Sequence, residues 1–281
     1  MLAKQLTRQK IDVNKGALVI GGGMSGITAA LELADMGFKT YLVEKTARLG
    51  GNALRLGTSA TGRHYGHYID EYVDKVLGHP LIDVFLNTGV KSINGYVGKY
   101  TTILDCAAKD KTGSVKEKEI NHGVIIVATG ANEHKPVEYL YGSDHRVVTQ
   151  MELEDILKDR DAALQKLKAG NSGKIVKSVV MIQCVGSRDS ERPYCSRVCC
   201  NQAVKNALLL KEIDKDIDIT ILYRDLRTYG FNEINYHTAR KAGVRFMRYE
   251  PENKPRVDNE DGNLNVIVKE LILDEQILLR A

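Results

Sequence analysis

The sequence has no long apolar run and no block of like charge. Its longest apolar runs, such as residues 123–131, are much shorter than the roughly 20 residues of a membrane-spanning helix, and the N-terminal MLAKQLTRQK lacks the apolar stretch of a signal peptide. The 40 Lys and Arg residues exceed the 36 Asp and Glu residues, and the resulting net charge of +4 is spread along the chain. We therefore expect a cytoplasmic protein without a membrane span and without nucleic acid as a partner.

Cysteine is scarce and unevenly placed. Five cysteines in 281 residues are too few for a disulfide-scaffolded secreted fold, and a reducing compartment keeps cysteines as thiols or metal ligands. All but one of them lie within residues 184–200, and this clustering calls for a chemical explanation. The remaining composition, with 43% hydrophobic and 27% charged residues, is that of a folded chain with one or two domains.

The first part of the chain has the pattern of a βαβ unit. Residues 17–20 form a short apolar segment and residues 21–26 a glycine-rich turn. Apolar residues then recur at helical spacing up to Gly37, which can end a helix, and residues 39–44 form the next apolar segment. A unit of this size is typical of one half of a dinucleotide-binding domain.

A second βαβ pattern follows a polar stretch at residues 166–174, which we expect to be a domain boundary. Between the two patterns we expect helices at 66–78 and 150–158, a small meander of β-segments at 82–87, 90–98 and 100–108, and a strand at 123–131. After the boundary we expect strands at 178–182, 218–225 and 244–249, a helix ending near 213, a helix at 232–243, and β-segments at 264–270 and 276–280. The predicted fold is therefore α/β, with two Rossmann-like domains and parallel sheets, divided into a tail at 1–15, a first dinucleotide-binding domain at 16–150 and a second domain at 172–281.

Gly21, Gly23 and Gly26 form a G-x-G-x-x-G motif between the first predicted strand and helix. The first glycine allows the tight turn, the second lets the backbone approach a pyrophosphate, and the third allows close packing of helix and strand. Glu44 ends the second strand about 20 residues later, where a carboxylate can accept hydrogen bonds from a ribose. The alternative, a structural turn with a surface glutamate, is disfavoured because strand, glycines, helix and acid agree.

The clustered cysteines have the spacing C-x10-C-x3-C-C and are Cys184, Cys195, Cys199 and Cys200. This is the number of thiolates that a 4Fe-4S cluster takes, and the nearby Arg188, Arg192 and Arg197 would offset their negative charge. A structural zinc site would use the same ligands, but it usually arranges cysteines as two C-x2–4-C pairs. A redox disulfide is the third option; C-x-x-C is missing, and pairing of the adjacent cysteines is strained. Ligand number and spacing favour iron–sulfur.

Two further motifs resemble the two-dinucleotide-binding flavoproteins of the thioredoxin-reductase type. The loop after Glu44 carries a glycine doublet, and residues 128–130 read Ala-Thr-Gly. In such proteins the second βαβ unit carries another glycine motif for NAD(P)H, whereas here cysteines occupy that turn. The resemblance implies FAD, with cofactor contacts from Gly21, Gly23, Met24, Ser25, Gly26, Glu44, Lys45, Gly50, Gly51, Asn52, Ala128, Thr129 and Gly130.

Three longer segments, residues 16–45, 179–212 and 224–255, resemble the flavin-binding A subunit of CoB-CoM heterodisulfide reductase and its relatives. The similarity runs from about Gly16 to the end of the chain, and the cysteine segment is its most specific part. This resemblance implies a flavoprotein core that binds FAD, with a 4Fe-4S cluster nearby on Cys184, Cys195, Cys199 and Cys200. The chain has none of the C-x2-C-x2-C-x3-C-P motifs that family members usually add, and it stops before the closing segment of the FAD domain. We therefore expect part of a larger polypeptide, either a fragment or a chain that a partner chain completes.

The resemblance implies an oxidoreductase. We assign no catalytic residue, because the flavin and the cluster would perform the chemistry. FAD would exchange electrons in pairs and the cluster would pass them singly to partner subunits, a chemistry that the family extends to flavin-based electron bifurcation. The expected partners are heterodisulfide-reductase-like catalytic subunits, a ferredoxin, and a hydrogenase or formate dehydrogenase module. Two alternatives stay open: an NAD(P)H-dependent flavin disulfide reductase, and a scaffold in which zinc replaces iron and the flavin is structural.

Overall fold

The computed structural model describes residues 12–57, 65–109, 115–169 and 176–281. The chain divides into two compact units, one formed by Met1–Leu54 with Tyr65–Asn132 and the other by Arg55–His64 with Glu133–Ala281. Each unit has its own parallel sheet and its own apolar core. The tail expected at residues 1–15 lies largely outside the described residues.

The first unit is built on a parallel sheet whose strands have the spatial order β3-β2-β1-β7. All neighbouring strands in it run parallel. The turn that follows β1 lies at the carboxyl edge of the sheet, where ligands bind in open α/β folds. Strand β1 is an interior strand, with β2 on one side and β7 on the other. The bounds of the strands are β1 Ala17–Ile20, β2 Thr40–Val43, β3 Ile82–Phe85 and β7 Val124–Val127.

Helix α1 (Met24–Asp35) follows β1 after the glycine turn. Ile27, Ala30, Leu31 and Ala34 recur three or four residues apart and are all buried, so they form the apolar face of the helix. Gly37, with φ of +88°, donates its N–H to the Ala34 carbonyl at 2.9 Å and ends the helix. Helix α2 (Tyr65–Gly78), expected at residues 66–78, buries Val76 in the same core, with Tyr72 and Val73 packed against it.

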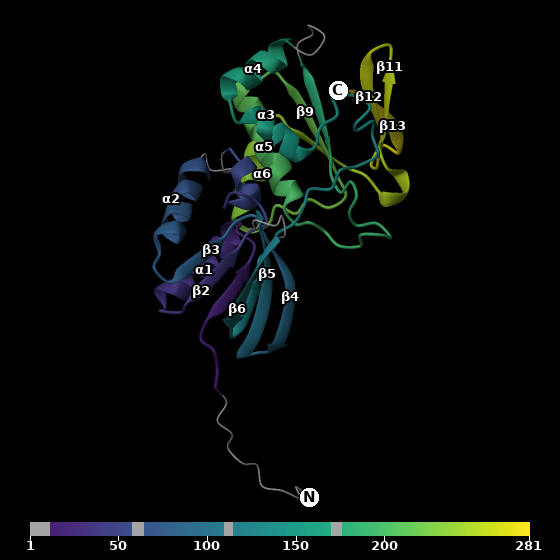
Figure 1. Ribbon diagram of the computed structural model, residues 1–281. Coiled ribbons are helices and arrows are strands. Elements are labelled where there is room, and N and C mark those ends of the chain that lie inside the picture. Colours follow the sequence, from purple (N-terminus) through teal and green to yellow (C-terminus); the bar gives the residue numbers. More distant parts are fainter. Residues whose placement is uncertain (1–11, 58–64, 110–114, 170–175) are drawn as a thin grey trace, which may run out of the picture. The chain divides into compact units, whose positions relative to one another are not determined.

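The two faces of this sheet carry different layers (Figure 1). Val19 lies in the apolar cluster formed with α1 and α2. Leu18, the preceding residue, points to the opposite face and packs with Leu104 and Ile120 of an antiparallel sheet. The parallel sheet is therefore covered by helices on one side and by strands on the other.

The antiparallel sheet differs from the expected meander. It consists of β4 (Thr88–Tyr96), β5 (Lys99–Lys109) and β6 (Val115–His122), in that order. The sequence pattern places the segment 82–87 in the meander, but residues 82–85 form β3 of the parallel sheet, where Ile82 and Val84 pack with the apolar cluster of α1 and α2. The sequence pattern missed β6 because it is an edge strand: of its residues 116–122, only Ile120 and His122 are buried.

The second unit has a parallel sheet with the order β10-β9-β8. Its strands are β8 (Ser178–Ile182), β9 (Asp218–Tyr223) and β10 (Arg245–Arg248), and helices α5 (Cys199–Ile213) and α6 (Glu233–Lys241) connect them. Ala203, Val204, Ala207 and Leu210 form the buried face of α5 against this sheet. The expected strand–helix alternation of this half is therefore confirmed.

Helix α3 (Gln150–Leu157) is fixed to α5 by buried polar side chains. It begins with a capping box, in which Thr149 and Glu152 exchange hydrogen bonds between side chain and backbone. One turn later, Glu154 forms an ion pair with Lys205 of α5, and their side chains are only 1% and 8% exposed. Helix α4 (Arg160–Ala169) follows and takes up the first part of the polar stretch at residues 166–174, where the sequence predicts a domain boundary. The two units instead divide earlier in the chain, between Asn132 and Glu133.

A third small sheet completes the second unit. It is antiparallel, with β12 (Asn263–Glu270) between β11 (Arg256–Glu260) and β13 (Glu275–Arg280). Val266 and Val268 pack with Leu222 and Tyr249 in a separate apolar cluster. The whole is a mixed α/β fold with parallel, Rossmann-like sheets, as predicted. None of the helices in the described part of the chain is long and apolar enough to cross a membrane.

Candidate functional site

The turn between β1 and α1 needs glycine at two positions for steric reasons. Gly21 has φ of +110°, and a Cβ there would lie 2.3 Å from the Ala128 carbonyl oxygen. A Cβ on Gly26 would lie 1.8 Å from the Gly21 carbonyl oxygen. These two glycines therefore allow the backbones of β1, α1 and the segment after β7 to approach closely.

Gly23 is different because nothing crowds it. A Cβ built there meets no atom within 4 Å among the described residues. Gly23 is also the N-cap of α1, and having no side chain it leaves the N–H groups of the first turn accessible. The space beside Gly23 is thus bordered by free N–H groups and the positive end of a helix, the combination that favours a phosphate group.

Glu44 is bound tightly at the end of β2. Its carboxylate accepts the Gly22 N–H at 2.7 Å and both the N–H and the hydroxyl of Thr46 at 2.8 Å. Burial to 7% exposure raises the pKa of this carboxyl, but the hydrogen bonds from Gly22 and Thr46 outweigh it and hold the pKa below its usual value. Glu44 is therefore an anion that links the glycine turn to the end of β2.

The glycine doublet lies directly beside this turn. Gly50 donates its N–H to the Gly22 carbonyl at 2.7 Å and pairs with Gly23 in an isolated parallel bridge. A Cβ on Gly51 would lie 3.1 Å from the Gly23 Cα. The residues that the sequence placed in one cofactor site thus meet here, although they are far apart along the chain.

The other candidate cofactor residues surround the same turn. Ala128 donates its N–H to the Ile20 carbonyl at 2.8 Å, and Asn52 donates to the Ala131 carbonyl, also at 2.8 Å. Met24 is half-buried and packs against the apolar core. The remaining candidates of this group are exposed and free to face a ligand, namely Ser25, Lys45, Thr129 and Gly130.

The second candidate site is the loop between β8 and α5. Cys184 stands just past the end of β8, Cys195 lies in the loop, and Cys199 and Cys200 open α5. Cys200 is buried and the other three are half-buried. Cys184, Arg188 and Arg197 have positive φ angles of 64°, 59° and 62°. Such conformations are costly for residues other than glycine and concentrate at functional sites.

Three of these thiols interact electrostatically. The Cys200 thiol donates a hydrogen bond to the Asp225 carbonyl at 3.8 Å. Interaction between the neighbouring side chains of Cys199 and Cys200 lowers the pKa of Cys199 to about 6, against the opposing effect of burial, and together with burial raises the pKa of Cys200. Burial and the negative charge of Cys199 raise the pKa of Cys184, while Arg188 and Arg224 act in the opposite direction. The structure therefore brings Cys184, Cys199 and Cys200 into one electrostatic group.

Cys195 makes a different contact, since its sulfur accepts the N–H of Arg197 at 3.3 Å. Within the described ranges, no three His, Cys, Asp or Glu side chains are placed so as to hold one metal ion.

Arg224 and Asp225 belong to this second site, although no motif in the sequence points to them. They follow the end of β9, which runs parallel to β8 with Ile182 paired to Leu222. Arg224 donates to the Arg188 carbonyl at 2.7 Å, and Asp225 pairs with the Arg188 guanidinium at 2.6 Å. Their position could have been inferred from the sequence only by recognising that β8 and β9 end side by side.

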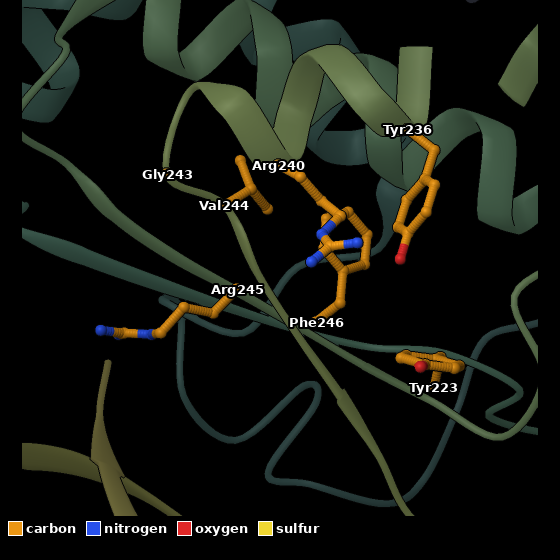
Figure 2. Close-up of a pocket in the computed structure, with 7 residues that line it drawn as sticks. All are labelled: Tyr223, Tyr236, Arg240, Gly243, Val244, Arg245 and Phe246. Atoms are coloured by element: carbon orange, nitrogen blue, oxygen red, sulfur yellow. The ribbon is translucent and has the colours of Figure 1, made fainter. Parts of the chain in front are cut away.

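A cavity of about 500 Å³ lies elsewhere in the second unit, between α6 and the edge of the β10-β9 pair (Figure 2). Tyr236 and Phe246 meet edge-to-face at 4.8 Å between ring centroids, and Arg240 lies 5.7 Å from the Tyr236 centroid. The side chain of Arg245 extends away from these rings. None of the residues proposed from the sequence lines this cavity.

Comparison with known families is informative for the first site. Residues 17–75, which include the glycine turn, Glu44 and the glycine doublet, match the family of FAD-dependent oxidoreductases. The second site lies outside this match.

Solved structures with a similar fold include two thioredoxin reductases. The thioredoxin reductase of Lactococcus lactis matches with a TM-score of 0.59 at 19% identity, over 95% of this chain and 74% of its own. The thioredoxin reductase of T. acidophilum matches with a TM-score of 0.54 at 13% identity, over 94% of this chain and 73% of its own. At these identities the similarity concerns the fold alone.

Relatives in sequence are more specific. The A subunit of the H(2):CoB-CoM heterodisulfide,ferredoxin reductase of Methanothermobacter marburgensis is 31% identical over 97% of this chain and 53% of its own length. The A subunit of the H(2)/formate:CoB-CoM heterodisulfide,ferredoxin reductase of Methanococcus maripaludis is 30% identical over 99% of this chain and 54% of its own. The chain thus spans about half the length of these relatives. Over nearly its whole length, it is a homologue of the A subunit of heterodisulfide reductase.

Proposed function

We propose that this chain is an FAD-binding electron-transfer subunit of the heterodisulfide reductase type, which relays electrons between FAD and a 4Fe-4S cluster. The observation that carries the proposal is the open backbone at Gly23 beside the buried anion of Glu44, in a chain homologous to the A subunit of heterodisulfide reductase. FAD supplies two-electron chemistry and the cluster supplies one-electron chemistry.

In the first unit, the chain's own residues would bind and orient the dinucleotide. The N–H groups at the start of α1 would hold the pyrophosphate over Gly23, which presents no side chain in that direction. Glu44, already an anion, would accept hydrogen bonds from a ribose diol. Gly50, Gly51 and the segment 128–130 border the same space and would contact the remainder of the cofactor.

In the second unit, Cys184, Cys195, Cys199 and Cys200 would supply thiolates to iron. The chemistry of the donor set supports this, because soft thiolates select iron–sulfur clusters and zinc over harder cations. Of the three interacting thiols, Cys199 supports it through its lowered pKa, whereas burial and the neighbouring cysteine raise the pKa of Cys184 and of Cys200. Cysteines also stand where a second nucleotide-binding glycine turn would be expected, which argues against NAD(P)H as a direct electron donor.

The partners follow from the names of the relatives. Those names include CoB-CoM heterodisulfide, ferredoxin, H(2) and formate. We infer that this chain exchanges electrons with heterodisulfide-reductase-like catalytic subunits, a ferredoxin, or a hydrogenase or formate dehydrogenase module. Electron bifurcation would belong to such a complete assembly.

The deciding experiment is anaerobic purification followed by quantification of iron, acid-labile sulfide, zinc and released flavin on one sample. We expect about four irons, four sulfides and one FAD per chain, since a cubane cluster takes four thiolates. Zinc in place of iron would favour the scaffold alternative. Flavin that is bleached by NAD(P)H in a sample without iron would favour the disulfide reductase, and either result would overturn the relay.

A further inference from the structure

The cavity between α6 and the edge of the β10-β9 pair is not used by the proposed function (Figure 2). Its volume of about 500 Å³ lies within the range of roughly 300–1,000 Å³ that is usual for pockets of small ligands. A volume in the lower half of this range suits a molecule of the size of a mononucleotide better than a dinucleotide. None of the four clustered cysteines and none of the candidate FAD residues lines this cavity.

Aromatic rings form part of the wall of this cavity. Tyr236 of α6 and Phe246 of β10 pack edge-to-face, with 4.8 Å between the ring centroids and 79° between the ring planes. Tyr223, which ends β9, is half-buried and contributes a third ring. Rings that are held against each other present a fixed flat surface, and such a surface makes favourable contacts with a planar ring of a ligand.

Three hydrogen-bonding groups of the lining are unused. The hydroxyls of Tyr223 and Tyr236 and the guanidinium of Arg240 have no hydrogen-bond or ion-pair partner among the residues that the structure describes. Arg240 follows Tyr236 by one helical turn, and its Cζ lies 5.7 Å from the centroid of that ring. The hydroxyl of Tyr236 points from α6 toward the strand that carries Tyr223 (Figure 2). Burial and Tyr236 raise the pKa of Tyr223, while Arg248 and Arg240 act in the opposite direction, so these groups lie within electrostatic reach of one another.

The second arginine of the lining is already satisfied. Arg245 donates through Nε to the Thr220 hydroxyl at 3.1 Å, and its Nη1 lies 3.7 Å from the Asp218 carboxylate. Its side chain extends away from the rings (Figure 2). Of the two arginines that line the cavity, Arg240 is therefore the one whose charge has no counter-ion within the described part of the chain.

We propose that this cavity binds a planar heteroaromatic ring that carries one phosphate group, a ligand of the nucleoside monophosphate class. The rings of Tyr236 and Phe246 contact the base, and Arg240 together with the hydroxyls of Tyr223 and Tyr236 donates hydrogen bonds to the phosphate. Donors on three separate side chains suit a tetrahedral phosphate, which has three free oxygens, better than a flat carboxylate. The site needs neither FAD nor the cluster, so it goes beyond the proposed function and stands independently of it.

The test is isothermal titration calorimetry of the 281-residue chain with AMP, adenosine and inorganic phosphate as separate probes. AMP is also a part of FAD, so each titration is done with and without excess FAD, which occupies the candidate site of the first unit. The variants are Arg240→Gln, which removes the charge, and Tyr236→Phe, which removes one hydroxyl and keeps the ring. Arg245→Gln removes the same charge from the side chain that points away and is the matched control. The melting temperature of each variant checks that it is folded.

We expect AMP to bind at least about tenfold more tightly than adenosine or phosphate, both with and without FAD. Arg240→Gln should weaken AMP binding at least about tenfold and Tyr236→Phe about fivefold, because each loses hydrogen bonds to the phosphate. Arg245→Gln should bind AMP as the wild type does.

Equal AMP affinity of Arg240→Gln and the wild type would overturn the inference, and so would the absence of AMP binding at concentrations up to about 1 mM. Loss of AMP binding on addition of FAD would place AMP in the first unit and would also overturn it. Phosphate that binds as tightly as AMP would show a site for a simple anion without recognition of a ring. Equal weakening in Arg240→Gln and Arg245→Gln would show an effect of net charge alone, and either of these last two results contradicts the proposed ligand.

Discussion

Single glycines in the turn after β1 have separable roles. Gly23 has φ of −74° and ψ of 176°, which any residue adopts, and its Cβ position is empty. Gly23→Ala should therefore leave the unfolding free energy unchanged or raise it by up to about 1 kcal/mol. It should weaken FAD binding at least about tenfold, since the new methyl group occupies the space that a pyrophosphate would need.

Titration with FAD, followed by quenching of its fluorescence, measures this effect. Gly66→Ala is the control, because its Cβ also meets nothing within 4 Å of the described atoms while lying away from the turn, on α2. Equal FAD affinity of Gly23→Ala and wild type would contradict the assignment. Gly26→Ala should fail to fold correctly, because its Cβ would lie 1.8 Å from a backbone oxygen.

Glu44 makes the unfolding free energy of the first unit fall as the pH is lowered. Its folded pKa lies below the usual value of 4.5, so its contribution is complete above that value and is lost as pH falls through the lower folded pKa. Glu44→Gln removes this dependence and should cost about 1–3 kcal/mol at pH 7, because the carboxylate accepts three hydrogen bonds. Urea unfolding between pH 7 and pH 3 checks this, with the exposed Glu32→Gln as control. A parallel pH profile for Glu44→Gln and wild type would exclude the role given to Glu44.

At the scale of elements, the attachment of α3 to α5 depends on one buried ion pair. Lys205→Met leaves the Glu154 carboxylate, 1% exposed, without its cation and should destabilise the second unit by about 3–5 kcal/mol. Adding Glu154→Gln removes the stranded charge and should restore more than half of that loss, since Gln can still accept the Gly57 N–H. Lys75→Met, in an exposed pair with Glu71 on α2, should leave the stability of the first unit nearly unchanged. Chemical denaturation monitored by circular dichroism would show the difference, and equal losses for Lys205→Met and Lys75→Met would refute it.

Elements were predictable where pattern and environment agree. In the segment from β1 to β2, the apolar residues recur at helical spacing in α1 and in short runs in the two strands, and most of these residues are buried. The sequence alone therefore predicts these three elements. The sequence pattern predicts a polar linker over part of helix α4, because the described residues of this helix bury little beyond Ala163. Strand β6 was missed for the same reason. Elements with a narrow buried face carry too weak a pattern, and their neighbours decide their structure.

The candidate sites show the same limit. Glycine spacing and cysteine clustering are local in sequence, so the sequence alone is enough to name these candidate residues, and their contacts with cofactors stay predictions. Arg224 and Asp225 depend on β9 ending beside β8, a tertiary pairing that no local motif records.

At the scale of the whole molecule, the two cofactors should protect different units. FAD should slow amide exchange in peptides from residues 16–54, by up to about 100-fold at a free concentration 100 times the dissociation constant. Iron and sulfide should slow exchange in peptides from residues 176–228 of the second unit. Hydrogen–deuterium exchange with mass spectrometry measures both effects, and Gly23→Ala should lose only the first. Protection by FAD confined to the second unit would contradict the proposed arrangement.

The sheet order of the first unit also bears on how the chain folds during synthesis. The interior strand β1 can pair on one side with β2 once both have left the ribosome, but its other partner is β7, with Ala17 opposite Val124. The edge of β1 must therefore stay unpaired while the helices and the antiparallel sheet are made. When β7 pairs with β1, the segment 128–130 comes to lie against the glycine turn. The candidate FAD site is therefore complete only after β7, the last strand of this parallel sheet to be synthesised, has joined it.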